Sequence, residues 1–209
     1  MRRRPLAMLL LLLPVFLACA SAAHQEPAAA PLPGHQHGTG AEITIPVGAL
    51  YTVADVGFLQ GMIAHHAQAI HMSHLAETRA ADPRLLRLAQ KIGQSQVAEI
   101  DLMQGWLADH DQFVPDTSSH RTMMMPGMLT AAQLAELEAA SGPMFDRRFL
   151  ELMILHHEGA LAMVADLLAS PGAAQDVDVN VLANEVHLVQ TAELGAMHRM
   201  LDNLEGESP

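Results

Sequence analysis

The chain has 209 residues, half of them apolar, so it is long enough to bury the core of one compact domain and too short for a second large domain. Its 11 basic residues against 23 acidic residues give a formal net charge of −12, which disfavours nucleic-acid binding and attracts cations. The single cysteine excludes an intramolecular disulfide and a metal site built from several thiolates.

The first 22 residues have the pattern of an export signal. Three arginines at positions 2–4 precede an apolar run over residues 6–17, and small residues follow at positions 18–22. The run is too short to span a membrane as a helix. Phe16-Leu17-Ala18-Cys19 is similar to a lipoprotein cleavage box, whereas Ala20-Ser21-Ala22 offers an ordinary cleavage site. We therefore expect an exported protein that is either periplasmic or anchored at the cell envelope by a lipid on Cys19, with no other contact with a membrane.

Residues 23–50 are predicted to form a flexible tether between the signal and the folded domain. They are rich in alanine, proline and glycine and have little hydrophobic periodicity. The tether contains His24, His35 and His37, which we interpret mainly as solvated polar residues, although the His-x-His pair could capture a metal ion weakly.

Residues 51–205 are predicted to form the functional domain, because they contain the same pattern twice. Residues 55–72 match residues 146–163 at a constant offset of 91, with Asp, Phe, Leu, Met, Ile, both His, Ala and Met at equivalent positions. Residues 96–107 match residues 190–201 at an offset of 94. Each repeat, at about 54–109 and 144–203, is therefore two elements joined by a turn of slightly different length.

The elements are predicted to be amphipathic helices, because apolar residues recur at spacings of three, four and seven without an interior proline. We expect helices near 54–80, 84–109, 144–169 and 177–203, and a short connecting helix near 130–140 after Thr130. Asp82-Pro83 and Ser170-Pro171-Gly172 interrupt the two repeats as turns should. The predicted fold is all-α: a ferritin-like four-helix bundle built from two repeated helical hairpins.

One stripe of each helix carries the residues with metal-binding chemistry, and it faces the bundle interior. In the first hairpin, antiparallel pairing sets Met62 level with Met103, and the doublet His65-His66 level with Glu99 and Gln96. The second hairpin repeats this arrangement, so the two hairpins are predicted to meet in one polar, sulfur-containing layer. The candidate metal ligands are His65, His66, Met62, Met72, Glu99 and Met103 in the first repeat, and His156, His157, Met153, Met163, Glu193 and Met197 in the second.

Burying a layer of imidazoles and carboxylates costs free energy unless their polar atoms find partners, and a metal ion would be such a partner. A single core histidine or methionine is more often structural, but the doublet occurs twice beside a glutamate and methionines. Imidazole and thioether without thiolate favour copper, especially Cu(I), and its neighbour Ag(I). Zinc, bound through histidine and glutamate alone, is less favoured. A di-iron site is excluded because the positions three after Glu99 and Glu193 are Leu102 and Ala196 rather than histidine.

Other candidates carry less weight. His71 and His74 lie three apart on a helix face turned away from the core, and we interpret them as exposed polar residues rather than an outer metal site. His187 flanks the inner face of the last helix and is a further candidate ligand. The methionine-rich segment Met123–Met128, between the two repeats, is either an apolar plug over the bundle or an entry site for a soft metal ion.

The paired blocks Phe-x-x-x-Met-x-x-His-His-x-x-Ala and Gln-x-x-Glu-[Ile/Leu]-x-x-Met, with Met-Pro-Gly-Met-Leu-Thr between them, resemble the bacterial family called domain of unknown function 305. The resemblance covers residues 51–203. It implies an exported ferritin-like bundle and, for some members, copper-binding resistance proteins. It places the ligands on Met62, His65, His66, Glu99 and Met103, and on Met153, His156, His157, Glu193 and Met197.

Two classes of function remain open from the sequence. The favoured one is a non-catalytic copper binder, in copper homeostasis or resistance, that sequesters the ion or exchanges it with another copper carrier or exporter. The alternatives are a metal-dependent oxidoreductase of the helical-bundle type and a zinc-binding structural protein. We do not expect an enzyme, because no nucleophile–base pair or cofactor loop is recognisable.

Overall fold

The computed structural model of the chain describes residues 43–206. The predicted export signal, Cys19 and the tether histidines lie outside the described residues. Within this part the chain forms helices and no strand. The helices are α1 (Val53–Arg79), α2 (Pro83–Asp109), the short 3-10 helix η1 (Thr117–Arg121), α3 (Ala131–Ala139), α4 (Pro143–Ala169) and α5 (Val177–Gly206). The all-α prediction is confirmed, and the predicted helix boundaries agree with these to within three residues.

Local sequence explains where the helices begin. Thr52 starts α1 with a capping box, in which its hydroxyl accepts from the Asp55 amide and the Asp55 carboxylate accepts from the Thr52 amide. Asp82 caps α2, whose first residue is a proline that has no amide hydrogen to satisfy. Thr130 caps α3 with a second capping box.

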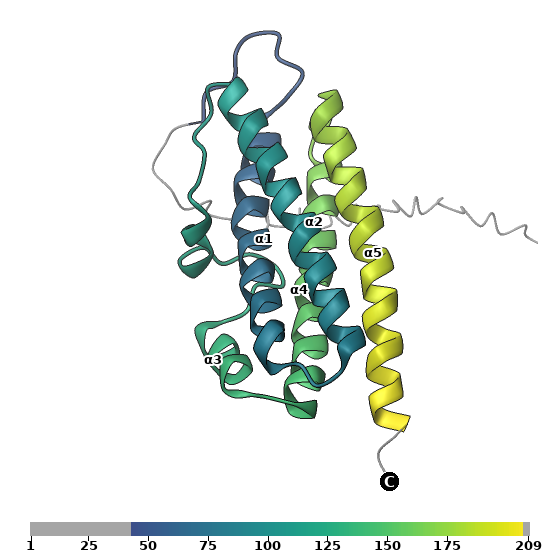
Figure 1. Cartoon of the computed structure of the whole chain (residues 1–209). Helices are drawn as coiled ribbons and strands as arrows, with labels where there is room; N and C mark the ends of the chain where they lie inside the picture. Colours follow the sequence, from purple (N-terminus) through teal and green to yellow (C-terminus); the bar gives the residue numbers. More distant parts are fainter. Residues whose placement is uncertain (1–42, 207–209) are drawn as a thin grey trace, which may run out of the picture. The chain divides into compact units, whose positions relative to one another are not determined.

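The long helices form two antiparallel hairpins, α1 with α2 and α4 with α5, which pack together mainly through α1 and α4 (Figure 1). The Asp55 carboxylate, at the start of α1, accepts from the amide of Ala174 after the end of α4, with a distance of 2.6 Å. Reciprocally, Asp146 at the start of α4 accepts from the amides of Ala81 and Asp82 after the end of α1. The two hairpins therefore run antiparallel and cap each other's turns.

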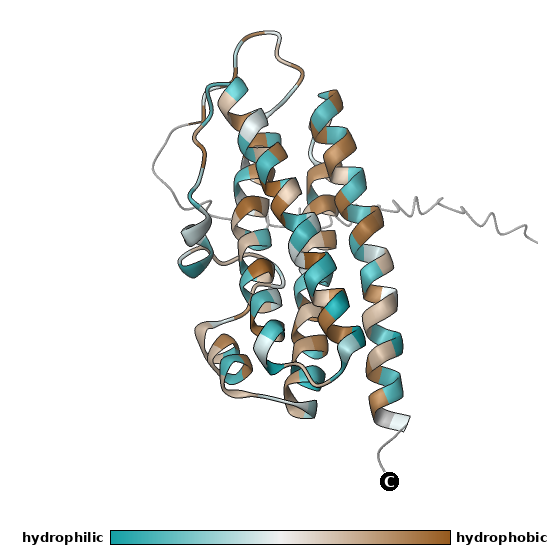
Figure 2. Cartoon of the chain, viewed as in Figure 1, coloured by the Kyte–Doolittle hydropathy of each residue, from teal (hydrophilic) through white to brown (hydrophobic). Residues whose placement is uncertain are grey.

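Two apolar clusters fill the bundle, and a polar layer separates them. One cluster includes Ile63 of α1 and Val186 of α5, and the other includes Ala69 of α1 and Met197 of α5. Hydrophobic and hydrophilic residues are mixed along each helix (Figure 2), and α1, which lies at the centre, is buried on every side from Asp55 to Ala69. Helix α4 has the length and hydropathy of a membrane span, but half of that apolar stretch is buried inside this bundle, as expected of a core helix.

Two irregular segments lie against the bundle. The connector 110–130 follows α1, because the Gln60 side chain donates to the Phe113 carbonyl and the Gln68 amide exchanges two hydrogen bonds with the Leu129 backbone. Residues 43–50, which the sequence assigns to the tether, also contact the domain, with Ile43 and Ile45 packed against the first apolar cluster.

Candidate metal centre

The two histidine doublets lie in the polar layer between the apolar clusters. His65 and His66 come from α1, and His156 and His157 come from α4; none has any exposed surface. The rings of His65 and His156 meet with their centroids 3.8 Å apart and an angle of 42° between their planes. Because α1 and α4 are antiparallel, equivalent residues of the two repeats meet at the centre of the bundle.

The second histidine of each doublet pairs with the glutamate of its own hairpin. His66 Nε2 lies 2.5 Å from Glu99 Oε2, and His157 Nε2 lies 3.0 Å from Glu193 Oε2. In each pair the imidazole Nε2–H donates to the carboxylate, so Nδ1 is the nitrogen that a metal ion could reach. This is the pairing of histidine with glutamate that the hairpin register predicts.

The first histidine of each doublet has fewer partners. His65 Nε2 donates to the carbonyl of Pro126 in the connector, at 3.1 Å, and its Nδ1 has no partner. Both ring nitrogens of His156 are buried and neither makes a hydrogen bond of normal geometry, although the His65 backbone lies close enough to oppose the lowering of the His156 pKa. A neutral imidazole has one donor and one acceptor, so His156 leaves both unsatisfied at a position without water access.

Burial keeps both central rings uncharged. Desolvation, aided by the nearby His66 and His157, lowers the pKa of His65 from 6.5 to about 3. Desolvation also lowers the pKa of His156 well below 6.5, and the neighbouring His65 lowers it further. Neutral imidazole is the form that ligates a metal ion, so these two rings are ready to bind at neutral pH.

Other polar atoms of the layer also lack hydrogen bonds. The side-chain amides of Gln96 and Gln190 are buried without a hydrogen-bond partner, and Glu193 Oε1 has no hydrogen bond but forms an ion pair with Lys91 Nζ at 3.8 Å. Unsatisfied buried groups cost on the order of 1–3 kcal/mol each, and a bound cation would relieve this cost for the acceptor atoms of the layer, which are the amide oxygens, Glu193 Oε1 and one nitrogen of each imidazole. Among residues 43–206, no three His, Cys, Asp or Glu side chains are already arranged around one point. The side chains that bind a metal ion would therefore have to rotate toward it.

The predicted methionines divide between the two apolar clusters on either side of the layer. Met62 and Met103 belong to one apolar cluster, with Met163 packed against it. Met153, Met197 and Met72 belong to the other cluster. Each side therefore receives two methionines from one repeat and one from the other. The sequence predicts one sulfur-containing layer; the antiparallel packing of α1 and α4 places Met62 and Met153, the methionines before the two doublets, in different clusters.

Sequence reasoning proposed residues 123–128 as a plug or an entry site but missed the contact between the connector and His65. The Pro126 carbonyl is a backbone group, so no residue type signals its contact with His65. A Cβ built on Gly61 would lie 2.9 Å from Met125 Sδ and 3.4 Å from the Met163 methyl group, so both methionine side chains lie against this glycine. The methionine-dense composition of the connector is the only signal in the sequence for this contact. His187, a further candidate from the sequence, is exposed and outside the layer.

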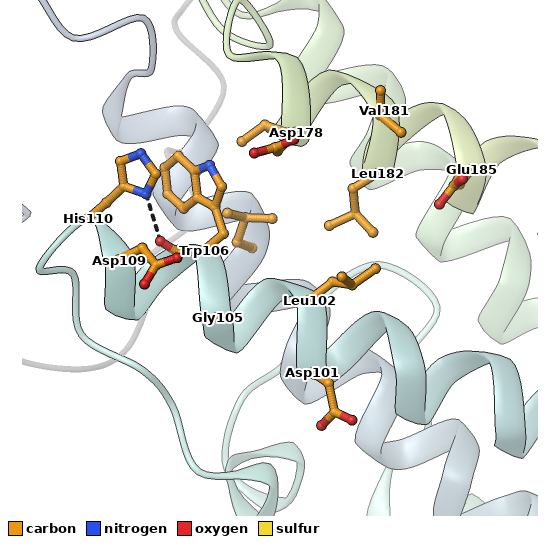
Figure 3. Close-up of a pocket in the computed structure, with 12 residues that line it drawn as sticks. Asp101, Leu102, Gly105, Trp106, Asp109, His110, Asp178, Val181, Leu182 and Glu185 are labelled. Atoms are coloured by element: carbon orange, nitrogen blue, oxygen red, sulfur yellow. Dashed lines mark hydrogen bonds between the residues drawn. The ribbon is translucent and has the colours of Figure 1, made fainter.

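The pocket in Figure 3 is separate from the histidine layer. It lies between α2 and α5, has a volume of about 560 Å³, and is lined by apolar side chains such as Leu102 and Leu182. Acidic residues surround it, and His110 stacks on Trp106 at one end, with ring centroids 3.9 Å apart. Its lining contains no candidate ligand.

Comparisons with known proteins reveal relatives of the same fold. CopM, in its Cu(II)-bound form, is 28% identical with a TM-score of 0.59, over 71% of this chain and 96% of that chain. CopM structures in the Cu(I)-bound and Ag-bound forms have TM-scores of 0.58 and 0.57 at the same identity. No curated protein sequence matches the chain.

Two further crystal structures carry the family description itself. A DUF305 protein from Streptomyces coelicolor has 30% identity and a TM-score of 0.65, over 73% of this chain and 94% of that chain. A DUF305 fragment from Deinococcus radiodurans has 30% identity and a TM-score of 0.63, over 73% and 98%. The model of the domain of unknown function DUF305 matches residues 55–201, as the sequence resemblance predicts. This chain therefore belongs to the DUF305 family.

Proposed function

We propose that this protein is an exported copper binder that holds Cu(I), and can hold Ag(I), in the buried histidine layer. The observation that carries the proposal is His156, whose two ring nitrogens are buried without a partner in contact with the ring of His65. A metal ion would take one lone pair from His156 and the lone pair of His65 Nδ1, and would thereby join the two repeats at their centre. The copper- and silver-bound structures of CopM support the same choice of ion.

The donor set favours a soft ion. His65 and His156 offer neutral nitrogens, and Met62 and Met153 offer thioethers one helical turn before them. Thioethers add affinity for Cu(I) and Ag(I) and little for Zn(II), and the layer has no thiolate. Glu99 and Glu193 hold the neighbouring imidazoles, which orients those rings as carboxylates do around metal-bound histidines.

The proposal is a binding function without catalysis. All four histidines are fully buried, so a bound ion would be shielded from solvent, which suits storage or transfer to another copper carrier or exporter. An oxidase would need an open coordination position that oxygen can reach. Export is proposed from the signal-like residues 1–22 and from the Streptomyces coelicolor relative, which is described as a candidate secreted protein.

Competition with a colorimetric Cu(I) chelator under anaerobic, reducing conditions tests the proposal. We expect the protein to take Cu(I) from the chelator and to prefer it over Zn(II) at equal free concentration. A variant with His65→Ala and His156→Ala should lose the tight site, while the exposed His198→Ala should not change it. If zinc wins at equal free concentration, the methionines are apolar packing and the copper proposal fails.

A further inference from the structure

A second group of histidines lies outside the bundle, on the face of α1 that the connector covers. His71 of α1 and His120 of η1 face each other, with ring centroids 6.1 Å apart and planes within 23°. Glu138 of α3 joins them, with its Oε1 2.9 Å from His71 Nε2. His74 lines the same groove, whose volume is about 450 Å³. Three elements that are far apart in the sequence thus bring nitrogen and oxygen donors together.

The hydrogen bonds leave lone pairs for a metal ion. His120 Nδ1 lies 2.7 Å from the Thr117 carbonyl and must donate to it, so Nε2 of that neutral ring carries the free lone pair. His71 donates its Nε2 hydrogen to the Glu138 carboxylate, which leaves Nδ1 as its lone pair. A backbone carbonyl on one imidazole and a carboxylate on the other are the partners that metal-bound histidines commonly have.

The simpler explanation is a surface ion pair between His71 and Glu138. Their side chains are 39% and 46% exposed, and such pairs contribute at most about 1 kcal/mol. A surface ion pair does not explain why His120 and His74 also line the same groove. Arg121 also lines the groove and repels cations, and Asp101, which lines it as well, carries the opposite charge. The partly exposed side chains have room to rotate, which they must do because no three such donors yet converge on one point among residues 43–206.

We propose that His71 and His120 form an outer binding site for a divalent cation of borderline softness, in which Glu138 orients the His71 ring, with Cu(II) bound most tightly and Zn(II) less so. Imidazole nitrogens without a thioether suit divalent copper, and the Irving–Williams order places Cu(II) above Zn(II). The outer site is chemically distinct from the histidine layer, which offers thioethers and is fully buried. It does not depend on the proposed function, because it shares no residue with that layer.

Paramagnetic broadening of backbone amide signals locates bound Cu(II) and tests the proposal. The chain, with His24, His35 and His37 replaced by alanine in every variant, is labelled with ¹⁵N and titrated with copper(II) chloride in air up to one equivalent. We expect signals of residues 71, 117–121 and 138 to broaden first. The double variant His71→Ala with His120→Ala should abolish this pattern and raise the dissociation constant at least about tenfold. Glu138→Gln should weaken binding while keeping the unbound spectrum, and the exposed His198→Ala should change neither.

Three results would overturn the outer site. Broadening that survives the double substitution would exclude the two histidines, and absence of broadening at one equivalent would exclude any such site. Broadening centred on residues 65 and 156 would show that Cu(II) enters the histidine layer alone. A failure of Cu(I) to bind that layer leaves all three measurements unaffected, so the two proposals fail separately.

Discussion

His65 and His156 occupy the same position in the two repeats, and their rings meet with centroids 3.8 Å apart across the α1–α4 interface. Both rings are buried and neutral, and between them only one of four nitrogens has a hydrogen-bond partner. The fold thus places two unsatisfied imidazoles in contact at its centre. Without a ligand, this contact makes the stability of the protein sensitive to pH.

We predict that the metal-free protein loses stability as the pH falls below 6.5. The pKa of His65 is lowered to about 3 in the folded chain, so between pH 6.5 and 3 the unfolded chain binds the proton more readily than the folded one. The free energy of unfolding is therefore highest above pH 6.5 and falls toward pH 3. For His65 alone the loss at pH 4.5 is about 3 kcal/mol, since each pKa unit corresponds to about 1.4 kcal/mol. Urea unfolding of the metal-free protein at pH 7.5 and 4.5 measures it.

Carboxylates also bind protons as the pH falls toward 4.5, so a matched variant is needed to separate the contribution of the two histidines to the pH dependence of stability. Replacing both His65 and His156 with glutamine removes their titration and keeps polar side chains of similar size. The variant should have a shallower dependence of unfolding free energy on pH between 6.5 and 4.5. An unchanged slope would show that the central rings do not titrate on unfolding.

The reciprocal caps are the subject of the second prediction. Asp55→Ala removes the acceptor of the Ala174 amide, and Asp146→Ala removes that of the amides of Ala81 and Asp82. Each substitution should lower the free energy of unfolding by about 2 kcal/mol, because buried hydrogen bonds to a charged group contribute about 1.5–3 kcal/mol. Thermal or urea unfolding checks this. Asp101→Ala, at an exposed site on α2, is the control, and an equal effect there would contradict the capping role.

Much of the fold could be predicted because the relevant signals are local. Helix periodicity and turns such as Asp82-Pro83 define the four helices, and the hairpin register then pairs His66 with Glu99. The route of the connector could not be predicted, since it depends on side-chain bonds to backbone groups, such as that of His65 to Pro126. The division of the methionines between the two apolar clusters could not be predicted either. It depends on the antiparallel packing of the two repeats, and the residue pattern of one helix gives no information about that packing.

The third prediction concerns the close approach of the connector to α4. A Cβ built on Gly159 would lie 2.1 Å from the Pro126 carbonyl oxygen, which no shift of a flexible side chain can relieve. Gly127 lies opposite with a positive φ of 76°, so the chain turns there in a conformation that glycine favours. Gly159→Ala should therefore displace the connector and destabilise the fold by about 1–3 kcal/mol.

Hydrogen exchange measures this displacement. Amides of residues 123–129 should exchange faster in Gly159→Ala, together with the amide of His65 if the loss of the Pro126 contact loosens α1. Gly105→Ala is the matched control, because a Cβ there meets nothing within 4 Å, and alanine should stabilise this helix by up to about 1 kcal/mol. Unchanged exchange in residues 123–129 would show that the connector tolerates the added methyl group.

The last prediction decides between one shared copper site and two separate ones. If the layer binds copper through the central contact, then His65→Ala and His156→Ala should each weaken Cu(I) binding by at least about tenfold, because either change removes a ligand of the same ion. The double variant should be little worse than either single variant, since both remove the same interaction. Two separate sites would behave differently: each single substitution would halve the number of ions bound and leave the other site at full affinity. Native mass spectrometry counts the bound ions, and chelator competition measures their affinity, with His187→Ala as the exposed control. The contact between the two rings favours the shared site, and half-capacity binding by both single variants would rule it out.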